Sequence, residues 1–285
     1  MLLQTFKNPK FILLVISLFT IALVAHSYLF SDQKVLGKKT QEVAIISTLG
    51  SSQPQSTPQS LTSPSPTPSP QPSKTTYTIA LFGDSMIDTM GENLDYLNKS
   101  LSAKYPETTF KFYNFGIGSQ NVEQGLARWD EEFHYQNRNY SPISKIKPDI
   151  IILGSFSYNP FPPHDKNRHY IKLKELVIKA KLQTSNVYLL AEIAPTKVGF
   201  GKGPGGVNWP QDLANKQAQN IVEQLENAIN ISKSENITLI NAYKESLTEG
   251  KFGNPVYVSN HDGIHPSVEG HVLMANLIAK TIKLK

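Results

Sequence analysis

Tyr77-Thr-Ile-Ala-Leu-Phe-Gly-Asp-Ser-Met-Ile-Asp88 is the segment from which the fold of this chain can be inferred. Residues 77–82 are apolar or β-favouring, so they predict a buried strand that Gly83 ends. A helical pattern begins near Asp88, so Ser85 lies between a strand and a helix, where open α/β sheets bind ligands. Backbone N–H groups at a helix start favour developing negative charge, so we interpret Ser85 as a nucleophile rather than a capping serine.

Beyond this segment, short apolar strands alternate with amphipathic helices. Strands are predicted at 77–82, 109–114, 149–153, 186–192 and 237–240. Helices are predicted near 88–104, 121–131, 166–182, 212–233 and 267–283. This alternation is typical of parallel strands with helices on both faces. We therefore expect one α/β domain over residues 77–285, a three-layer α/β/α sandwich around a five-stranded parallel sheet.

The positive charge of the chain is concentrated before this domain. The net charge is +5 over 285 residues. Residues 1–75 contain six Lys and two acidic residues, whereas the remainder has 22 basic and 21 acidic residues. A nearly neutral domain argues against the electrostatic binding of nucleic acid, so we expect no nucleic-acid partner. The chain has no cysteine, which excludes disulfides, thiolate metal sites and a cysteine nucleophile.

An apolar run near the N-terminus predicts contact with a membrane. Residues 11–30 carry no Asp, Glu, Lys or Arg, and as a helix they would span roughly 30 Å, the thickness of a hydrocarbon core. They follow a short tail, residues 1–10. We expect an uncleaved transmembrane anchor over 11–30. The alternative is a signal peptide cleaved near Ala25-His26-Ser27, although this site is a poor match to the small-x-small pattern.

Residues 31–76 predict a linker between the anchor and the domain. Residues 51–76 are almost entirely Ser, Thr, Pro and Gln and include seven prolines. Such a composition buries too little apolar surface to fold and favours an extended, disordered spacer. The expected arrangement is a single-pass protein with its domain outside the cytoplasm, on a stalk within the cell envelope. A linker with no required reach is an equal alternative, and secretion after signal cleavage is the alternative location.

A second motif, Asp262-Gly-Ile-His265, precedes the last predicted helix. An Asp three residues before a His in a turn can accept the imidazole Nδ1–H, so that Nε2 can take a proton from a serine. The motif is common, and its simpler interpretation is a helix-start turn with a surface His. Because Ser85 and this motif both lie at predicted strand-to-helix junctions, we expect a catalytic triad of Ser85, His265 and Asp262.

These motifs resemble those of the SGNH, or GDSL-type, hydrolase family over residues 77–283. Gly83-Asp84-Ser85 matches the block that carries the nucleophile, and Asp262-Gly-Ile-His265-Pro-Ser matches the block that carries the Asp and the His. Asn114-Phe-Gly-Ile-Gly-Ser119 looks like the second block, in which a glycine N–H helps to form the oxyanion hole. The resemblance implies a flavodoxin-like sheet and serine esterase chemistry, with no cofactor and no metal.

The resemblance also implies an oxyanion hole formed by the N–H groups of Ser85 and Gly118 and the side chain of Asn159. An ungapped match puts Ser119, not Gly118, at the family's glycine, so both remain candidates for the second backbone donor. The third block of the family, Gly-x-Asn-Asp, is changed here, because Phe156 occupies the Asn position and Asn159 comes three residues later. The alternative role for Asn159 is that of a turn residue.

Several other residues near the predicted strand ends have open roles. The glycine-rich segment 199–206 predicts a flap, with Trp209 as a possible platform for substrate. Phe156, Tyr158 and Phe161 are interpreted equally as pocket walls or as ordinary packing. Glu192 ends the fourth predicted strand and is interpreted as a hydrogen-bonded structural carboxylate. His261 with His265 forms a weak metal motif, because Gly263 and Pro266 break the helix that would align two imidazoles.

Together these observations predict a membrane-tethered, extracytoplasmic serine esterase that cleaves a small O-acyl ester. The expected substrate is an ester-bearing small molecule or an envelope polysaccharide. An envelope O-acyltransferase is the first alternative, because it would use the same triad with a sugar hydroxyl in place of water. A non-catalytic glycan-binding module is the alternative from another class, suggested by the altered third block.

Overall fold

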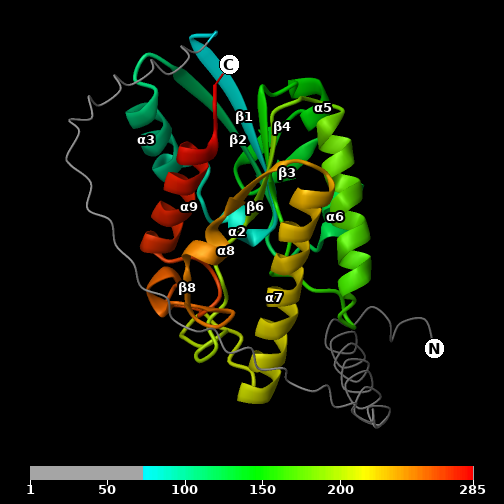
Figure 1. Ribbon diagram of the computed structural model, residues 1–285, viewed down its shortest axis with the longest axis vertical. Coiled ribbons are helices and arrows are strands. Elements are labelled where there is room, and N and C mark those ends of the chain that lie inside the picture. The colour runs from blue at the N-terminus through cyan, green and yellow to red at the C-terminus, as the bar shows by residue number, and fades with distance from the viewer. Residues whose placement is uncertain (1–72, 285) are drawn as a thin grey trace, which may run out of the picture. The chain divides into compact units, whose positions relative to one another are not determined.

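The structure of the protein, a computed structural model, describes residues 73–284 (Figure 1). The predicted tail at 1–10, the predicted anchor at 11–30 and all but the last four residues of the predicted linker at 31–76 lie outside these described residues. Within 73–284, no helix combines the length and the apolar character that crossing a membrane requires.

Five parallel strands form the central sheet. They are β1 (Thr76–Gly83), β2 (Thr109–Gly116), β5 (Ile150–Gly154), β6 (Val187–Ala191) and β7 (Thr238–Asn241). Their order in the sheet is β2-β1-β5-β6-β7, which is the flavodoxin-like order. Every residue of β5 and β6 is buried, because helices cover both faces, and this explains why their sequences are continuously apolar. All five predicted strands are confirmed.

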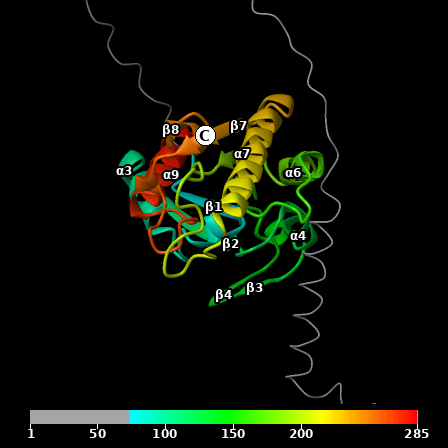
Figure 2. The same ribbon diagram turned by 90° about the horizontal axis from the view of Figure 1, so that it is seen from below.

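Helices cover both faces of this sheet and complete the predicted three layers (Figures 1 and 2). Two helices, α3 (Asp95–Lys104) and α9 (Val268–Thr281), pack together on one face. The other face is covered by α4 (Val122–Ala127), α6 (Lys166–Lys181) and α7 (Gln211–Ser234). The α/β/α sandwich expected from the alternation of strands and helices is therefore confirmed.

The structure differs from the expectation in the segment after β1. A single helix was predicted near 88–104, but the chain forms a short helix α2 (Ser85–Asp88) and then α3. Gly91 and Leu94 between them have φ values of 87° and 52°. These left-handed conformations do not belong to a right-handed helix, so the helix is interrupted there.

Several short elements were not predicted. Two hairpins occur, β3 (Phe133–Tyr135) with β4 (Arg138–Tyr140), and β8 (Leu247–Glu249) with β9 (Phe252–Gly253). The others are α5 (Ile143–Ile146), α8 (Ala242–Glu245) and a 3₁₀ turn at Pro255–Tyr257. Elements of two to four residues are too short to produce a hydrophobic period that sequence reasoning can detect.

The order of the strands determines where a ligand can enter. β1 and β5 are neighbours in the sheet, but the helices that follow them, α3 and α6, lie on opposite faces. In open α/β sheets, such a switch point leaves a crevice between the two loops at the carboxyl ends of the strands. Here those loops begin with Asp84-Ser85 and with Ser155, which places the predicted nucleophile beside the altered third block.

Candidate active site

Ser85 is the first residue of α2 and directly follows the end of β1. The side chain of Asp84 caps this short helix by accepting a hydrogen bond from the N–H of Met86 at 3.0 Å. Only glycine fits at position 83, because an added Cβ would lie 2.3 Å from Cγ1 of Ile87. The local sequence Gly-Asp-Ser therefore produces a tight turn that presents Ser85, which is 9% exposed, at the sheet edge.

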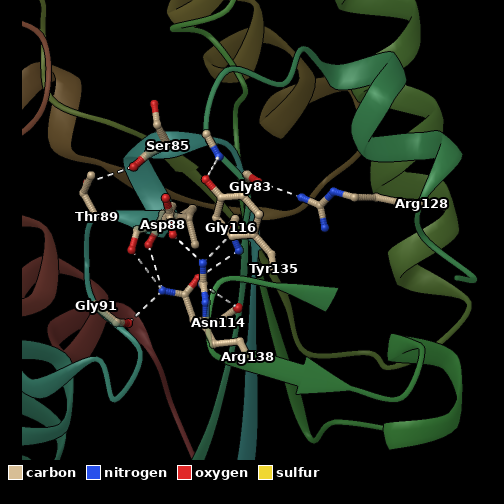
Figure 3. A network of polar contacts seen from close by, with 12 residues as sticks. Gly83, Ser85, Asp88, Thr89, Gly91, Asn114, Gly116, Arg128, Tyr135 and Arg138 are labelled. Atoms are coloured by element: carbon tan, nitrogen blue, oxygen red, sulfur yellow. Dashed lines mark hydrogen bonds and ion pairs between the residues drawn. The ribbon is translucent and has the colours of Figure 1, made fainter. Parts of the chain in front are cut away.

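A buried polar network fixes the other end of this helix (Figure 3). The guanidinium of Arg138 forms an ion pair with Asp88 and donates to the carbonyl of Asn114 at 2.9 Å. The side-chain amide of Asn114 donates to the carbonyls of Ile87 at 3.0 Å and of Gly91 at 2.8 Å. Strand β4, which carries Arg138, was not predicted, so this support for the turn at Ser85 was missed.

The Asp262-His265 motif has the local geometry that its spacing predicts. Oδ2 of Asp262 lies 2.8 Å from Nδ1 of His265. Oδ1 accepts the backbone N–H groups of Ile264 at 2.8 Å and of His265 at 2.9 Å. Burial alone would raise the pKa of Asp262, but these hydrogen bonds outweigh it and hold the pKa below its ordinary value. Asp262 is therefore ionised and orients the imidazole with Nε2 available.

One cavity of about 590 Å³ connects the two motifs. Ser85, Asp262 and His265 all line it, although they come from opposite ends of the domain sequence. The other lining residues are Ser119, Asn121, Gln124, Tyr158, Asn159, Pro160, Pro162, Phe200, Gly205, Val207, Trp209, Gln217 and Ile264. The structure thus brings the three predicted triad residues to a single space that is open to a ligand.

The two candidates for the backbone oxyanion donor lie in different surroundings. The N–H of Gly118 donates to the hydroxyl of Tyr135 at 3.4 Å and Gly118 does not line the cavity. Ser119 does line it, with φ of 61°, a left-handed value that favours glycine. A glycine would adopt this conformation without strain. The sequence favoured Gly118 as the donor, but its N–H already bonds the hydroxyl of Tyr135, which lies on the unpredicted strand β3.

Asn159 lines the cavity and also contacts the residue before the nucleophile. Its Nδ2 donates to Oδ2 of Asp84 at 2.9 Å. Asp84 is fully buried, and burial raises its pKa to about 6, while the hydrogen bonds from Met86 and Asn159 oppose that rise. A side-chain amide has two N–H bonds, so one hydrogen of Asn159 remains for a ligand.

The aromatic residues of the loop that follows β5 lie partly in the core and partly at the cavity. Phe156 is fully buried with φ of 56°, and a Cβ on Gly125 would lie 2.5 Å from its ring atom Cζ. Tyr158 lines the cavity and donates its hydroxyl to the carbonyl of Ile193 at 2.9 Å. Phe161 is buried and lies outside the lining. Phe156 therefore anchors the loop, and Asn159, three residues later, reaches the cavity.

The glycine-rich segment packs against the turn that carries His265. The N–H of Gly205 donates to the carbonyl of His261 at 2.8 Å, and the N–H of Gly201 donates to that of Gly263 at 3.0 Å. A Cβ on Gly203 would lie 2.3 Å from the carbonyl oxygen of His261. Glycines are therefore needed for this close approach, which also places Trp209, with 38% exposure, in the cavity lining.

Known proteins share both the sequence pattern and the fold. The sequence model of the family described as GDSL-like lipase/acylhydrolase matches residues 79–278. The fold is similar to that of a lipase/acylhydrolase from Enterococcus faecalis, with 19% identity, a TM-score of 0.52 and coverage of 73% of this chain and 98% of that one. It is also similar to a catalytic mutant of an acetylxylan esterase from Geobacillus stearothermophilus, with 19% identity, a TM-score of 0.50 and coverage of 73% and 95%. Among curated proteins, none matches the sequence significantly.

The fold and the family model together show the family to which this protein belongs. At such low identities the solved structures support the fold alone, whereas the family model spans most of the chain. The class they define is that of an α/β enzyme that hydrolyses esters. The chain belongs to the GDSL-like lipase/acylhydrolase family, as the resemblance of its motifs implied.

Proposed function

We propose that this protein is a serine esterase that removes a small O-acyl group from a carbohydrate, with Ser85, His265 and Asp262 as its triad. The observation that carries the proposal is the single cavity lined by Ser85 and by the hydrogen-bonded Asp262–His265 pair. These are the groups that nucleophilic acyl transfer requires: a hydroxyl, a base and a carboxylate that orients the base.

In the proposed reaction, Oγ of Ser85 attacks the ester carbonyl while Nε2 of His265 takes the hydroxyl proton. Asp262 stabilises the imidazolium that forms. His265 then gives the proton to the leaving alcohol, which produces an acyl-enzyme on Ser85. Water, deprotonated by the same imidazole, attacks this acyl group, and the carboxylic acid and the free serine are released.

We propose that three donors hold the oxyanion of each tetrahedral intermediate: the N–H of Ser85, the N–H of Ser119 and the second amide hydrogen of Asn159. Ser119 is favoured over Gly118 because it lines the cavity, whereas the N–H of Gly118 already donates to Tyr135. Preorganised donors of this kind stabilise charge that develops only in the transition state, so they increase kcat.

A neutral carbohydrate ester is the substrate class that the cavity supports best. Apart from the proposed triad residues Asp262 and His265, the described lining contains no Asp, Glu, His, Lys or Arg side chain. It offers the amides of Asn121, Gln124 and Gln217, which can hydrogen-bond hydroxyl groups, and the indole of Trp209, which can pack on a sugar face. An acetylxylan esterase is among the proteins of similar fold, and this supports an O-acetyl sugar.

The triad is tested by the full-length protein and two serine variants. Turnover of p-nitrophenyl acetate and release of acetate from acetylated xylo-oligosaccharides should be lost in Ser85→Ala. They should be retained in Ser102→Ala, which changes an exposed serine of α3. A fluorophosphonate probe should label the parent protein but not Ser85→Ala. Unchanged activity in Ser85→Ala would refute the triad, and saturable glycan binding without probe labelling would indicate a binding module.

Two further parts of the proposal concern the acceptor and the location. An O-acyltransferase would use the same triad, so acylated products formed in the presence of a sugar acceptor would assign transfer rather than hydrolysis.

We also propose that residues 11–30 anchor the chain in the cell membrane and that residues 31–76 hold the domain outside the cytoplasm. We expect the protein to stay with the membrane fraction in high salt, and we expect external protease to cleave the domain in intact cells. Recovery of the protein in the soluble cytoplasmic fraction would refute the anchor.

A further inference from the structure

Glu192 is a buried carboxyl group directly after β6, and the proposed reaction assigns it no role. Its side chain is fully buried. Oε1 accepts the backbone N–H of Ser155 at 2.7 Å, and Oε2 bonds the hydroxyl of the same residue. That hydroxyl also lies 2.5 Å from the hydroxyl of Ser157. One carboxyl group therefore holds the start of the loop that ends at Asn159.

The absence of a side chain at Gly154, the last residue of β5, makes room for this carboxyl group. A Cβ on Gly154 would lie 2.9 Å from Oε1 of Glu192 and 3.3 Å from Cα of Gly83. The strand ends that carry Asp84 and Ser155 are thus in close backbone contact, and the carboxyl group fills the space next to them. The charge of Asp84 raises the pKa of Glu192, and both carboxyl groups raise the pKa of Tyr158, so the two carboxyl groups lie close enough to interact.

The surroundings of Glu192 favour its neutral form. Burial, and then the charge of Asp84, raise the pKa of Glu192 to about 8, against the hydrogen bonds from Ser155. Three titratable groups lie around Glu192: Asp84 after β1 and Tyr158 after β5 interact with it electrostatically, and Nε2 of His169 on α6 lies 2.9 Å from the carbonyl oxygen of Ser155. Asp84 interacts in turn with Arg128 and His265. Burial lowers the pKa of His169 to about 4 and raises that of Tyr158 well above its ordinary value, so neither is charged near pH 8.

We propose that Glu192 is a positioning residue for the ester hydrolysis: its neutral carboxyl group holds the Ser155–Asn159 segment so that Asn159 stays between Asp84 and the substrate. This role rests on the proposed triad and oxyanion hole. Ionised Glu192 would add a second buried negative charge to that of Asp84, the residue directly before the nucleophile. Such a charge opposes the transition state directly, so the group must remain protonated for full activity.

The test is the pH dependence of kcat for the full-length protein between pH 6 and 10, after subtraction of the uncatalysed rate. If only the protonated form of Glu192 supports catalysis, kcat of the parent protein should fall about tenfold for each pH unit above roughly 8. Glu192→Gln keeps the shape and stays neutral, so it should remain active and lose this alkaline decline. The control Glu245→Gln changes an exposed carboxylate on α8 and should keep the decline.

One other variant separates positioning from a merely structural role. Glu192→Asp withdraws the carboxyl group by one methylene and should lower kcat by about tenfold or more, with KM changed less than about threefold. A parent profile that stays flat to pH 10 overturns the proposal whether or not a variant folds. Persistence of the parent's decline in folded Glu192→Gln also overturns it. Failure of the proposed triad would be recognised separately, because Ser85→Ala would then retain activity.

Discussion

Replacing Asn159 with alanine removes the amide that joins Asp84 to the cavity, and two effects follow. Loss of an oxyanion donor should lower kcat by about 10²- to 10³-fold, which corresponds to about 2.7–4 kcal/mol of transition-state stabilisation. Loss of the 2.9 Å hydrogen bond leaves Oδ2 of buried Asp84 without this partner and should lower the free energy of unfolding by about 1–3 kcal/mol. The kinetic effect belongs to kcat, because the oxyanion exists only after Ser85 has attacked.

The assay measures kcat and KM for p-nitrophenyl acetate together with urea unfolding of the same samples. Asn186→Ala is the matched control. Its amide donates to the carbonyl of Asp149 at 3.2 Å, before β6 and at the opposite edge of the sheet from the cavity. This variant should lose some stability and keep kcat within about threefold of the parent value.

One result would refute this reasoning. If Asn159→Ala unfolds more easily but keeps kcat within about threefold of the parent protein, Asn159 supports only the turn. The oxyanion hole would then consist of the backbone N–H groups of Ser85 and Ser119. Equal losses of kcat in Asn159→Ala and Asn186→Ala would instead assign the effect to general destabilisation.

Three further predictions concern single positions. Ser119→Gly should raise the free energy of unfolding by about 1 kcal/mol, because glycine adopts φ of 61° without strain. It should keep kcat within about threefold of the parent value if the oxyanion donor is the backbone N–H. A tenfold loss of kcat would assign that role to the hydroxyl of Ser119. Gly125→Ala should lower the free energy of urea unfolding by about 1–3 kcal/mol, because its Cβ would lie 2.5 Å from Cζ of Phe156; an unchanged midpoint would contradict this packing. The pKa of Asp262 is lowered in the folded state, so its stabilising effect is present above about pH 4 and lost as pH falls through the folded value. The stability difference between the parent protein and Asp262→Asn should therefore shrink between pH 6 and 3 in urea unfolding, and a constant difference would argue against the paired carboxylate.

The five strands could be predicted because their signal is local. Ile150 to Leu153 and Val187 to Ala191 are continuously apolar since both faces of the sheet are covered, and this pattern needs no knowledge of the strand order. The predicted helix over 88–104 was wrong in its middle, because left-handed φ values at Gly91 and Leu94 have no equivalent in hydrophobic periodicity.

The parts of the site that depend on local sequence could also be predicted, whereas the parts that depend on distant residues could not. A turn of four residues suffices to join Asp262 to His265, and a strand followed by Gly-Asp-Ser suffices to present Ser85, so the amino-acid order alone specifies these arrangements. The partners of Gly118, Asn159 and Glu192 are 17, 75 and 37 positions away in the chain. Which atoms meet across such separations depends on how neighbouring strands pack and where loops turn inward. Only the folded arrangement determines that Tyr135 accepts the N–H of Gly118, that Asp84 accepts a hydrogen bond from Asn159, and that the buried carboxyl group of Glu192 bonds Ser155.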